Sequence, residues 1–250
     1  MKIAVSTLAL YPKTLEEILP ILEDELKLKY CEIIHECPLN SINKDIFDSY
    51  SIKPTIHTPI SDMNIASPTK LIREGSVNEI KNSMDLANKI GADIVVIHPG
   101  KVPFLTQNFE DKILNLNYNS LKLCADYAKD LGLTMCVENM PNMEGYLFKD
   151  VSKLHDLVEN LDIYMTIDVG HAHNCNFSPK EMLNSNRIKH IHLSDNDGSW
   201  DNHDALGYGT LNFEELFKEL KNINYDDILV IEVKNPKEVE NSLTFLRNRF

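Results

Sequence analysis

Six short apolar runs in the chain each end at or beside a histidine or a carboxylate. Imidazole and carboxylate groups bind divalent metal ions such as zinc and manganese. A single histidine in such a place is more often structural, but six positions of the same kind along one chain point to a shared site. Three carboxylates in one pocket would repel one another unless a cation offsets their charge. A divalent-metal site is therefore predicted at His57, His98, Glu138, Asp168, His192 and Glu232.

Further ligand types follow two of these runs. His171 comes three residues after Asp168, and Asp201 and His203 lie in a polar loop that begins at Asp195. In an extended loop, residues two apart point to the same side, so Asp201 and His203 are spaced to face one centre. The other interpretation is a solvated, turn-rich loop over residues 195–204. Both interpretations stay open here, as does direct ligation by His171 and His203.

Three more residues are candidates for contact with a substrate. Asn139 directly follows Glu138, and Lys234 lies two residues after Glu232, so both are placed to hold substrate oxygens. A capping Asn and a surface Lys are the structural alternatives. Trp200 is a candidate for an apolar wall over the site, or for ordinary packing on a loop. The remaining histidines of note are interpreted as structural: His35, His155, His173 and His190.

These side chains can share a site only if the fold brings them together, and the chain alternates short β-rich runs with longer stretches of helical period. Such alternation is typical of parallel strands covered by helices. Eight strands are predicted: Lys2–Ser6, Tyr30–His35, Pro54–His57, Asp93–His98, Thr134–Glu138, Ile163–Asp168, His190–Leu193 and Leu229–Val233.

Helical patterns lie between the strands, and local signals mark several of their ends. Ser178 before Pro179 is typical of a helix start, and Gly91 and Gly132 follow helical stretches where a left-handed cap is needed. The segment 38–51 has the weakest helical pattern. The other helices are predicted at Thr14–Lys29, Thr69–Ile90, Thr106–Leu131, Lys149–Asn160, Ser178–Asn184, Phe213–Asn222 and from Pro236 to Arg249.

Eight strand–helix units in 250 residues predict a single-domain α/β protein, a (β/α)₈ TIM barrel spanning residues 1–250. A doubly wound open sheet would show the same alternation, but no Gly-x-Gly-x-x-Gly turn follows the first strand. In a barrel of parallel strands the carboxyl ends converge on one mouth, so ligands scattered along the sequence become neighbours.

Composition limits the partners and the compartment. The chain has 25 Lys and Arg against 38 Asp and Glu, a formal net charge of −13, which disfavours a nucleic-acid partner. The five cysteines are odd in number and form no Cys-x-x-Cys pair, so buried free thiols are expected. No signal-peptide pattern or run of ~20 apolar residues is present, which predicts a cytoplasmic protein without a membrane partner. The oligomeric state is left open.

In combination, these segments resemble the xylose-isomerase-like TIM-barrel superfamily, which holds sugar isomerases and epimerases together with AP endonucleases of the endonuclease-four type. The resemblance covers most of the chain. It rests on Ile56-His57-Thr-Pro59, Val96-Ile-His98-Pro-Gly100, Val137-Glu138-Asn139, Ile167-Asp168-Val-Gly-His171, His190-Ile-His192-Leu-Ser-Asp195, Asp201-Asn-His203, Leu206-Gly-Tyr-Gly209-Thr with Phe213, and Ile231-Glu232-Val.

Resemblance to the epimerase branch implies one site for a divalent cation, with Zn, Mn, Mg and Co all open. The two glutamates would exchange a proton with the carbon of a keto sugar, and His171 would contact a substrate oxygen. The implied catalytic residues are thus Glu138, Glu232 and His171, and the implied ligands are Glu138, Asp168, His192 and Glu232.

Resemblance to the endonuclease branch implies three zinc ions, and a matching residue type stands at each of its nine ligand positions. His57 and His98 would hold one zinc with Glu138 bridging to a second, which Asp168, His192 and Glu232 would complete. The third would be held by His171, Asp201 and His203.

Three departures count against the endonuclease branch. The opening Ser6-Thr-Leu-Ala-Leu-Tyr lacks the glycine-rich, histidine-containing opening of those enzymes, Asn202 stands where they have a basic residue, and the chain is acidic with short loops. Flipping a nucleotide from a duplex needs basic, wedge-forming loops. The sequence therefore predicts a metal-dependent isomerase or epimerase of a small sugar or sugar phosphate, using one to three cations. An AP endonuclease is the alternative, and an inactive metal- or sugar-binding barrel is a minor one.

Overall fold

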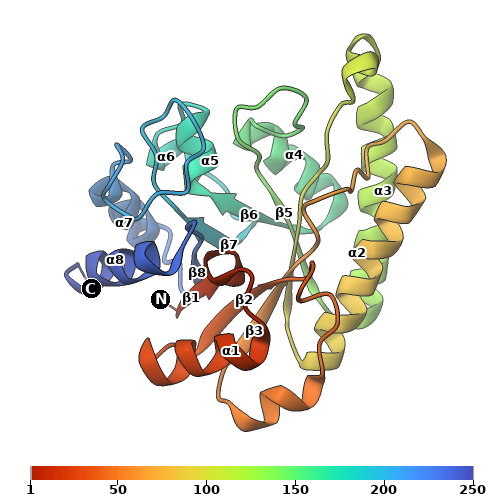
Figure 1. Ribbon diagram of the computed structural model, residues 1–250. Coiled ribbons are helices and arrows are strands. Elements are labelled where there is room, and N and C mark those ends of the chain that lie inside the picture. Colours follow the sequence, from red (N-terminus) through yellow and green to blue (C-terminus); the bar gives the residue numbers. More distant parts are fainter. Residues whose placement is uncertain (1, 250) are drawn as a thin grey trace.

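A computed structural model describes residues 2–249 of the chain. Its eight strands are all parallel and follow one another in sequence order around a closed barrel, in which β8 pairs with β1 (Figure 1). The predicted (β/α)₈ barrel is confirmed. The strands are β1 (Lys2–Ser6), β2 (Tyr30–Ile34), β3 (Lys53–His57), β4 (Ile94–Ile97), β5 (Thr134–Glu138), β6 (Tyr164–Asp168), β7 (Ile188–Leu193) and β8 (Ile228–Ile231).

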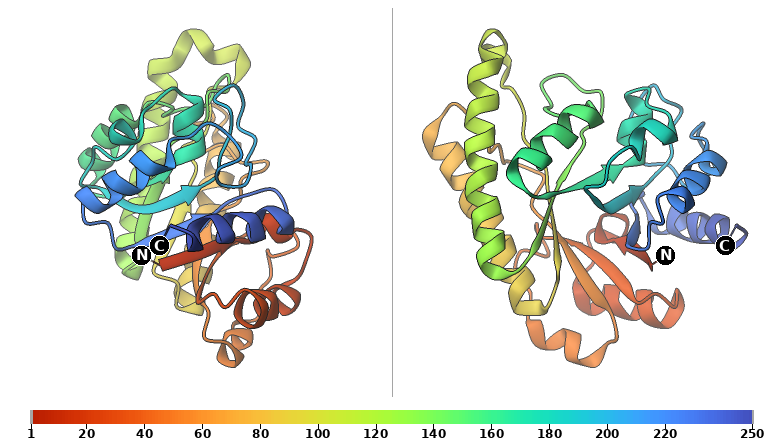
Figure 2. Two further views of the ribbon diagram at one scale, coloured as in Figure 1. Left: turned by 90° about the vertical axis from the view of Figure 1, so that its left-hand side faces the viewer. Right: turned by 180° about the vertical axis from the view of Figure 1, so that it is seen from behind.

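Helices surround the barrel, and the two longest, α2 and α3, run side by side along one flank (Figures 1 and 2). Short 3₁₀ turns lie at Thr7–Leu10, Lys44–Ser49 and Phe104–Phe109. The α-helices are α1 (Leu15–Pro20), α2 (Lys70–Ile90), α3 (Glu110–Leu131), α4 (Val151–Leu161), α5 (Val169–Asn174), α6 (Pro179–Met182), α7 (Phe213–Asn222) and α8 (Pro236–Arg247). Among residues 2–249, none of these helices is long and apolar enough to cross a membrane.

The helix ends follow the local chemistry that the sequence indicated. Gly91 and Gly132 end α2 and α3 with φ of 76° and 71°, in the left-handed region where glycine has no Cβ penalty. Ser178 and Glu181 form a reciprocal capping box at the start of α6.

Several predicted elements differ from the observed ones. The weak helix predicted over residues 38–51 is only the 3₁₀ turn at Lys44–Ser49, and the helix predicted from Thr106 becomes α-helical at Glu110. The helix predicted to reach residue 29 changes to a π turn after Pro20 and ends at Glu25. Helix α5 was missed: the chain turns helical directly after Asp168, whose side chain accepts a hydrogen bond from the His171 amide.

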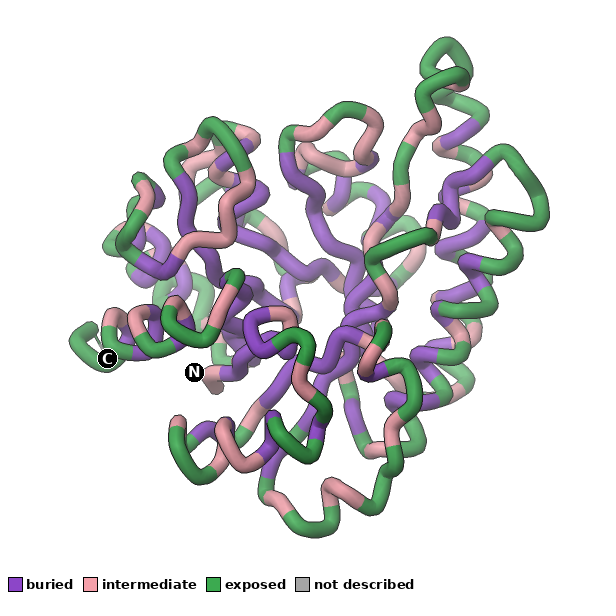
Figure 3. The backbone as a smooth tube through the Cα atoms, viewed as in Figure 1, coloured by how far each residue is buried: buried purple, intermediate pink, exposed green. Residues whose placement is uncertain are grey.

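Side chains inside the barrel change from apolar to polar along the strands. Ala4, Ile228 and Val230 form an apolar cluster in the lumen, with Tyr30 and Ile94 packed on it. Because side chains alternate between the two faces of a strand, the residues two positions further along also point inward. Glu32, two positions after Tyr30, is one of these, and the buried polar residues Thr55 and His190 contact it from β3 and β7. Figure 3 shows that the buried backbone is concentrated in the strands.

All five cysteines are free thiols. Cys31, Cys124 and Cys136 are buried as expected, but Cys37 is exposed and Cys175 is half-buried. The expectation of burial was therefore wrong for these two, which lie after β2 and α5 rather than inside an element.

Candidate metal centre

The carboxyl ends of the strands bring all nine predicted ligand residues to one end of the barrel. They fall into three groups, and within each group the candidate ligand atoms all lie within 4.8 Å of one another. Glu138 belongs to two groups and so joins them. The groups are His57, His98 and Glu138; Glu138, Asp168, His192 and Glu232; and His171, Asp201 and His203.

The central group surrounds one nitrogen of His192. Its Nδ1 lies 2.7 Å from Oε2 of Glu232, 3.2 Å from Oε1 of Glu138 and 3.9 Å from Oδ2 of Asp168. All four residues are buried. Oδ1 of Asp168 caps α5, whereas its buried Oδ2 has no hydrogen-bond partner. A buried carboxylate oxygen without a partner beside two other carboxylates fits a bound cation.

The second group lies against the other oxygen of Glu138. Oε2 of Glu138 is 3.1 Å from Nε2 of His57 and 3.2 Å from Nε2 of His98. The Nδ1–H of His57 donates to the carbonyl of Thr58 at 2.7 Å. This bond leaves the lone pair of Nε2 directed at the group, which is how proteins orient metal-binding histidines.

The third group shares Oδ2 of Asp201, which is 3.1 Å from Nε2 of both His171 and His203. Each histidine again donates its Nδ1–H to a carbonyl: His171 to Asn139 at 2.8 Å, and His203 to Glu232 at 3.0 Å. His203 has a φ of 48°, a left-handed conformation that is unfavourable for a side-chain-bearing residue and that often occurs at functional sites.

A buried carboxylate organises the loop that carries Asp201 and His203. Asp195 is fully buried and accepts hydrogen bonds from the backbone amides of Gly207, Gly209 and Leu211. Its backbone also bridges to Asp204. The interpretation of this segment as a simple solvated loop is therefore wrong, because the loop is tied to the barrel on both sides of the third group.

The crowding of charges shifts the pKa values of the group members. Burial raises the pKa of Asp168 to about 6, and the carboxylates of Glu138 and Asp201 add to this effect. Burial alone would lower the pKa of His203, but Asp201 raises it to about 9. In the same way Asp168 and Asp201 raise the pKa of His171 well above 6.5. The carboxylates thus attract positive charge, which protons supply when no cation is bound.

The donor set fits one to three divalent cations. Three histidines have one ring nitrogen committed to a carbonyl and the other turned toward a carboxylate group. Mixed imidazole and carboxylate donors suit zinc, manganese and related ions.

The residues expected to hold substrate oxygens have other partners. Asn139 is fully buried and bonds to both the amide and the carbonyl of Asp168, so it ties β5 to β6. Lys234 pairs with Asp204 and Glu238. Asn139 and Lys234 therefore have structural contacts in place of the predicted contacts with substrate. Trp200 is exposed and forms no buried wall.

Sequence reasoning missed two residues beneath the central group. Glu32 and His190 are fully buried, and Oε2 of Glu32 lies 2.7 Å from Nε2 of His190. The signal was present: Glu32 interrupts an apolar strand, and His190 stands two residues before His192 and so shares its inward face. The other histidines interpreted as structural each contact a hydroxyl: His35 with Ser83, His155 with Ser185 and His173 with Thr210.

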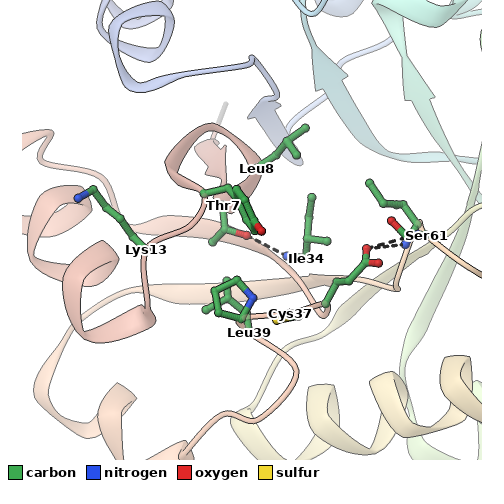
Figure 4. A pocket seen from close by; sticks show the side chains of 11 residues that line it. Thr7, Leu8, Lys13, Ile34, Cys37, Leu39 and Ser61 are labelled. Atoms are coloured by element: carbon green, nitrogen blue, oxygen red, sulfur yellow. Dashed lines mark hydrogen bonds between the residues drawn. The ribbon is translucent and has the colours of Figure 1, made fainter.

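A cavity of about 420 Å³ lies at the carboxyl ends of β1, β2 and β3, and its lining includes none of the nine candidate ligands (Figure 4). Leu8, Ile34 and Ile60 give it apolar walls, and Lys13 and Glu36 give it charged edges. Ile60 also lines a smaller cavity that reaches His98. The larger cavity therefore opens at the same end of the barrel as the candidate ligands, and the smaller one, which shares Ile60 with it, reaches one of them, His98.

In sequence, the chain is similar to one family of TIM-barrel proteins. A family model described as xylose isomerase-like TIM barrel matches residues 43–249. Two uncharacterised proteins of Methanocaldococcus jannaschii are similar over nearly the whole chain. MJ1311 is 32% identical, over 99% of this chain and 88% of its own length; MJ1614 is 34% identical, over 94% and 93%. A probable endonuclease 4 of Malacoplasma penetrans is 28% identical over 65% of this chain and 61% of its own.

Two solved structures superpose on nearly the whole chain. The crystal structure of a D-tagatose 3-epimerase-like protein superposes with a TM-score of 0.89 at 30% identity, covering 99% of this chain and 96% of that one. A D-psicose 3-epimerase of Clostridium cellulolyticum H10 superposes with a TM-score of 0.84 at 16% identity, covering 99% and 98%. The second likeness is one of fold alone.

Proposed function

The chain belongs to the xylose isomerase-like TIM-barrel family, and we propose that it is a divalent-metal-dependent isomerase or epimerase of a small sugar or sugar phosphate. The likeness to the D-tagatose 3-epimerase-like protein supports the substrate class. The observation that carries the proposal is the pair Glu138 and Glu232, buried carboxylates that approach the same nitrogen of His192 from strand β5 and from the end of β8.

Two carboxylates on different sides of one pocket can move a proton on and off a sugar carbon. One takes the proton from the carbon next to a carbonyl group, and the other returns a proton to the opposite face, which inverts that carbon. A cation held by Glu138, Asp168, His192 and Glu232 would polarise the carbonyl group and offset the charge of the enediolate. The Nδ1–H of His171 is committed to Asn139, so Nε2, which lies 3.1 Å from Oδ2 of Asp201, is the nitrogen that would contact a substrate oxygen.

The cavity at β1–β3 supports a small substrate. Its volume of about 420 Å³ lies within the range of small-molecule sites. The carbons away from the reacting centre would lie along Leu8, Ile34 and Ile60, which line this space (Figure 4).

The test is incubation of the cation-loaded protein with a panel of ketoses, aldoses and their phosphates in deuterated water, with product sugars assayed as well. We expect a new sugar product with deuterium at the exchanged carbon, and loss of turnover after chelation. Glu232→Gln keeps an oxygen ligand but cannot accept a proton, so it should keep its cation and lose about 10²–10⁴-fold in turnover. Full activity of this variant would refute its role as base, and failure with every sugar would refute the proposal.

A phosphodiester hydrolase of the endonuclease 4 type is the second candidate, and one observation favours it. The two flanking groups, His57 with His98 and His171 with Asp201 and His203, add candidate ligands beyond the four that a one-cation site needs. Clustered metals suit phosphodiester hydrolysis. In a three-cation site His171 is a ligand, whereas in a one-cation site it is free to contact substrate, so the number of bound cations separates the two candidates.

A further inference from the structure

Four histidines of the candidate metal centre differ in what contacts the nitrogen turned away from it. His57, His171 and His203 each donate that N–H to a backbone carbonyl. His192 is different. Its Nδ1 faces Glu138 and Glu232, and its Nε2, on the other side of the ring, lies 2.9 Å from Oε1 of Glu32.

Glu32 is itself fixed from two sides. Its other oxygen, Oε2, lies 2.7 Å from Nε2 of His190 and accepts a hydrogen bond from the hydroxyl of Thr55 at 3.2 Å. Glu32, His190 and His192 are fully buried and Thr55 is nearly so. No solvent can therefore replace a lost partner, and the carboxylate has little freedom to turn.

Imidazole binds a cation through a nitrogen that carries no proton, so ligation through Nδ1 requires the proton of His192 to sit on Nε2. That nitrogen is the one beside Glu32. A buried carboxylate at this position stabilises the tautomer with the proton on Nε2. It also makes Nδ1 more basic, so that its lone pair binds a cation more strongly. The contact between Glu32 and His192 would therefore affect how His192 binds the cation, although Glu32 itself lies deeper in the barrel than the candidate ligands.

We propose that Glu32 is a positioning residue of the metal centre: paired with His190, its carboxylate fixes the ring orientation and the Nε2–H tautomer of His192, so that Nδ1 is available to the cation. The inference rests on the proposed metal dependence but on neither candidate substrate. The buried polar residues around Glu32 would thus contribute to metal binding as well as to packing inside the barrel.

Glu32→Gln is the informative change. A glutamine has nearly the same size, but it presents one acceptor and one donor where the carboxylate presents two acceptors. Its single oxygen cannot lie against the ring nitrogens of both His190 and His192, so one ring must change tautomer or lose its partner. Disruption of such a partner typically costs about 10–100-fold in metal affinity.

Thr55→Val is the matched control, because it also removes a buried hydrogen bond to Glu32 but leaves the carboxylate against His192. Manganese affinity is measured by titration with detection of free Mn²⁺ by electron paramagnetic resonance, at one pH, together with the melting temperature of each metal-free protein. We expect the dissociation constant to rise about 10–100-fold in Glu32→Gln and to change far less in Thr55→Val.

A second measurement needs no variant and so survives a failure of Glu32→Gln to fold. In the zinc-loaded unaltered protein, ¹H–¹⁵N spectra of the histidine rings should show the proton of His192 on Nε2. A proton on Nδ1, unchanged manganese affinity in Glu32→Gln, or an equal loss in Thr55→Val would each overturn the inference. Absence of metal binding by the unaltered protein would instead refute the proposed function, and the inference with it.

Discussion

Four buried or nearly buried carboxylates share the candidate metal centre, and nearby histidines balance them. Asp201 and Asp168 raise the pKa values of His171 and His203, while burial and neighbouring carboxylates raise that of Asp168. In the absence of a cation, protons on these histidines and on Asp168 therefore offset the charge of the carboxylates, and a bound cation would displace them. At the scale of single residues, metal binding and proton release are therefore one equilibrium.

The metal-free protein should lose stability as the pH rises from about 6.5 to above 9. The pKa of His203 is about 9 in the folded protein against an ordinary 6.5. A raised histidine pKa gives stability that is fully present below the unfolded value and is lost as the pH rises through the folded value. We expect the melting temperature of chelator-treated protein to fall by several degrees over this interval, since 1 kcal/mol corresponds to roughly 2–4 °C in a domain of this size.

Thermal melts in buffers across this interval, with chelator and with Mn²⁺, check the prediction. A cation bound at His203 would replace this proton, so protein loaded there should show no such fall, whereas protein loaded only at the central group should keep it. His203→Gln should flatten the curve of the metal-free protein. A melting temperature of metal-free protein that stays constant across the interval would contradict the assignment.

At the scale of elements, the loop between β7 and α7 holds two of the three members of the third group in place. It carries Asp201 and His203, and its return to the barrel depends on amides that donate to Asp195. Gly209 is one of these donors, and a Cβ on it would meet the backbone of Asn196 and the carboxylate of Asp195. No flexible side chain can relieve the backbone contact.

Gly209→Ala should therefore loosen this loop while leaving the barrel folded. The overpacking should cost about 1–3 kcal/mol, and if the protein binds more than one cation, the one at His171, Asp201 and His203 should be the one lost. Metal content by mass spectrometry and the melting temperature measure both effects. Gly75→Ala is the control, because nothing lies within 4 Å of its added Cβ in α2 and the change should stabilise the helix by about 0.5–1 kcal/mol. Equal effects of the two substitutions would contradict the role of the loop.

At the scale of the whole molecule, charge bears on the choice between the two candidate functions. The formal net charge is −13, and phosphate-backbone binding depends on Lys and Arg contacts that neutralise phosphates. A small sugar needs only a pocket with a few polar groups. The balance of charge over the molecule thus favours the smaller substrate.

We expect the cation-loaded protein to show no binding to a DNA duplex with an abasic site at about 0.15 M salt, and no strand incision even at low salt. Gel mobility and denaturing electrophoresis measure the two outcomes, with an intact duplex as control. Incision at the abasic site, together with no product from any sugar, would reverse the choice and establish the hydrolase.

The sequence by itself determined the barrel and the identity of the candidate ligands. Eight strand–helix units leave few topologies, and in a closed parallel barrel the ends of the strands meet whatever their distance along the chain. Ligand types at His57, His98 and Glu138 could therefore be assigned to one mouth without coordinates. Gly91 and Gly132 could be recognised as helix ends because a left-handed cap depends only on the local backbone conformation.

The tertiary structure alone decided which inward side chains meet. Glu32 and His190 are 158 residues apart in the sequence, and no local pattern tells which residue of β2 faces which residue of β7 across a filled lumen. The binding of Asn139 to Asp168 was missed for the same reason, since the two residues end different strands. Side-chain alternation fixes which residues point inward, but stagger and packing of the whole barrel fix their partners.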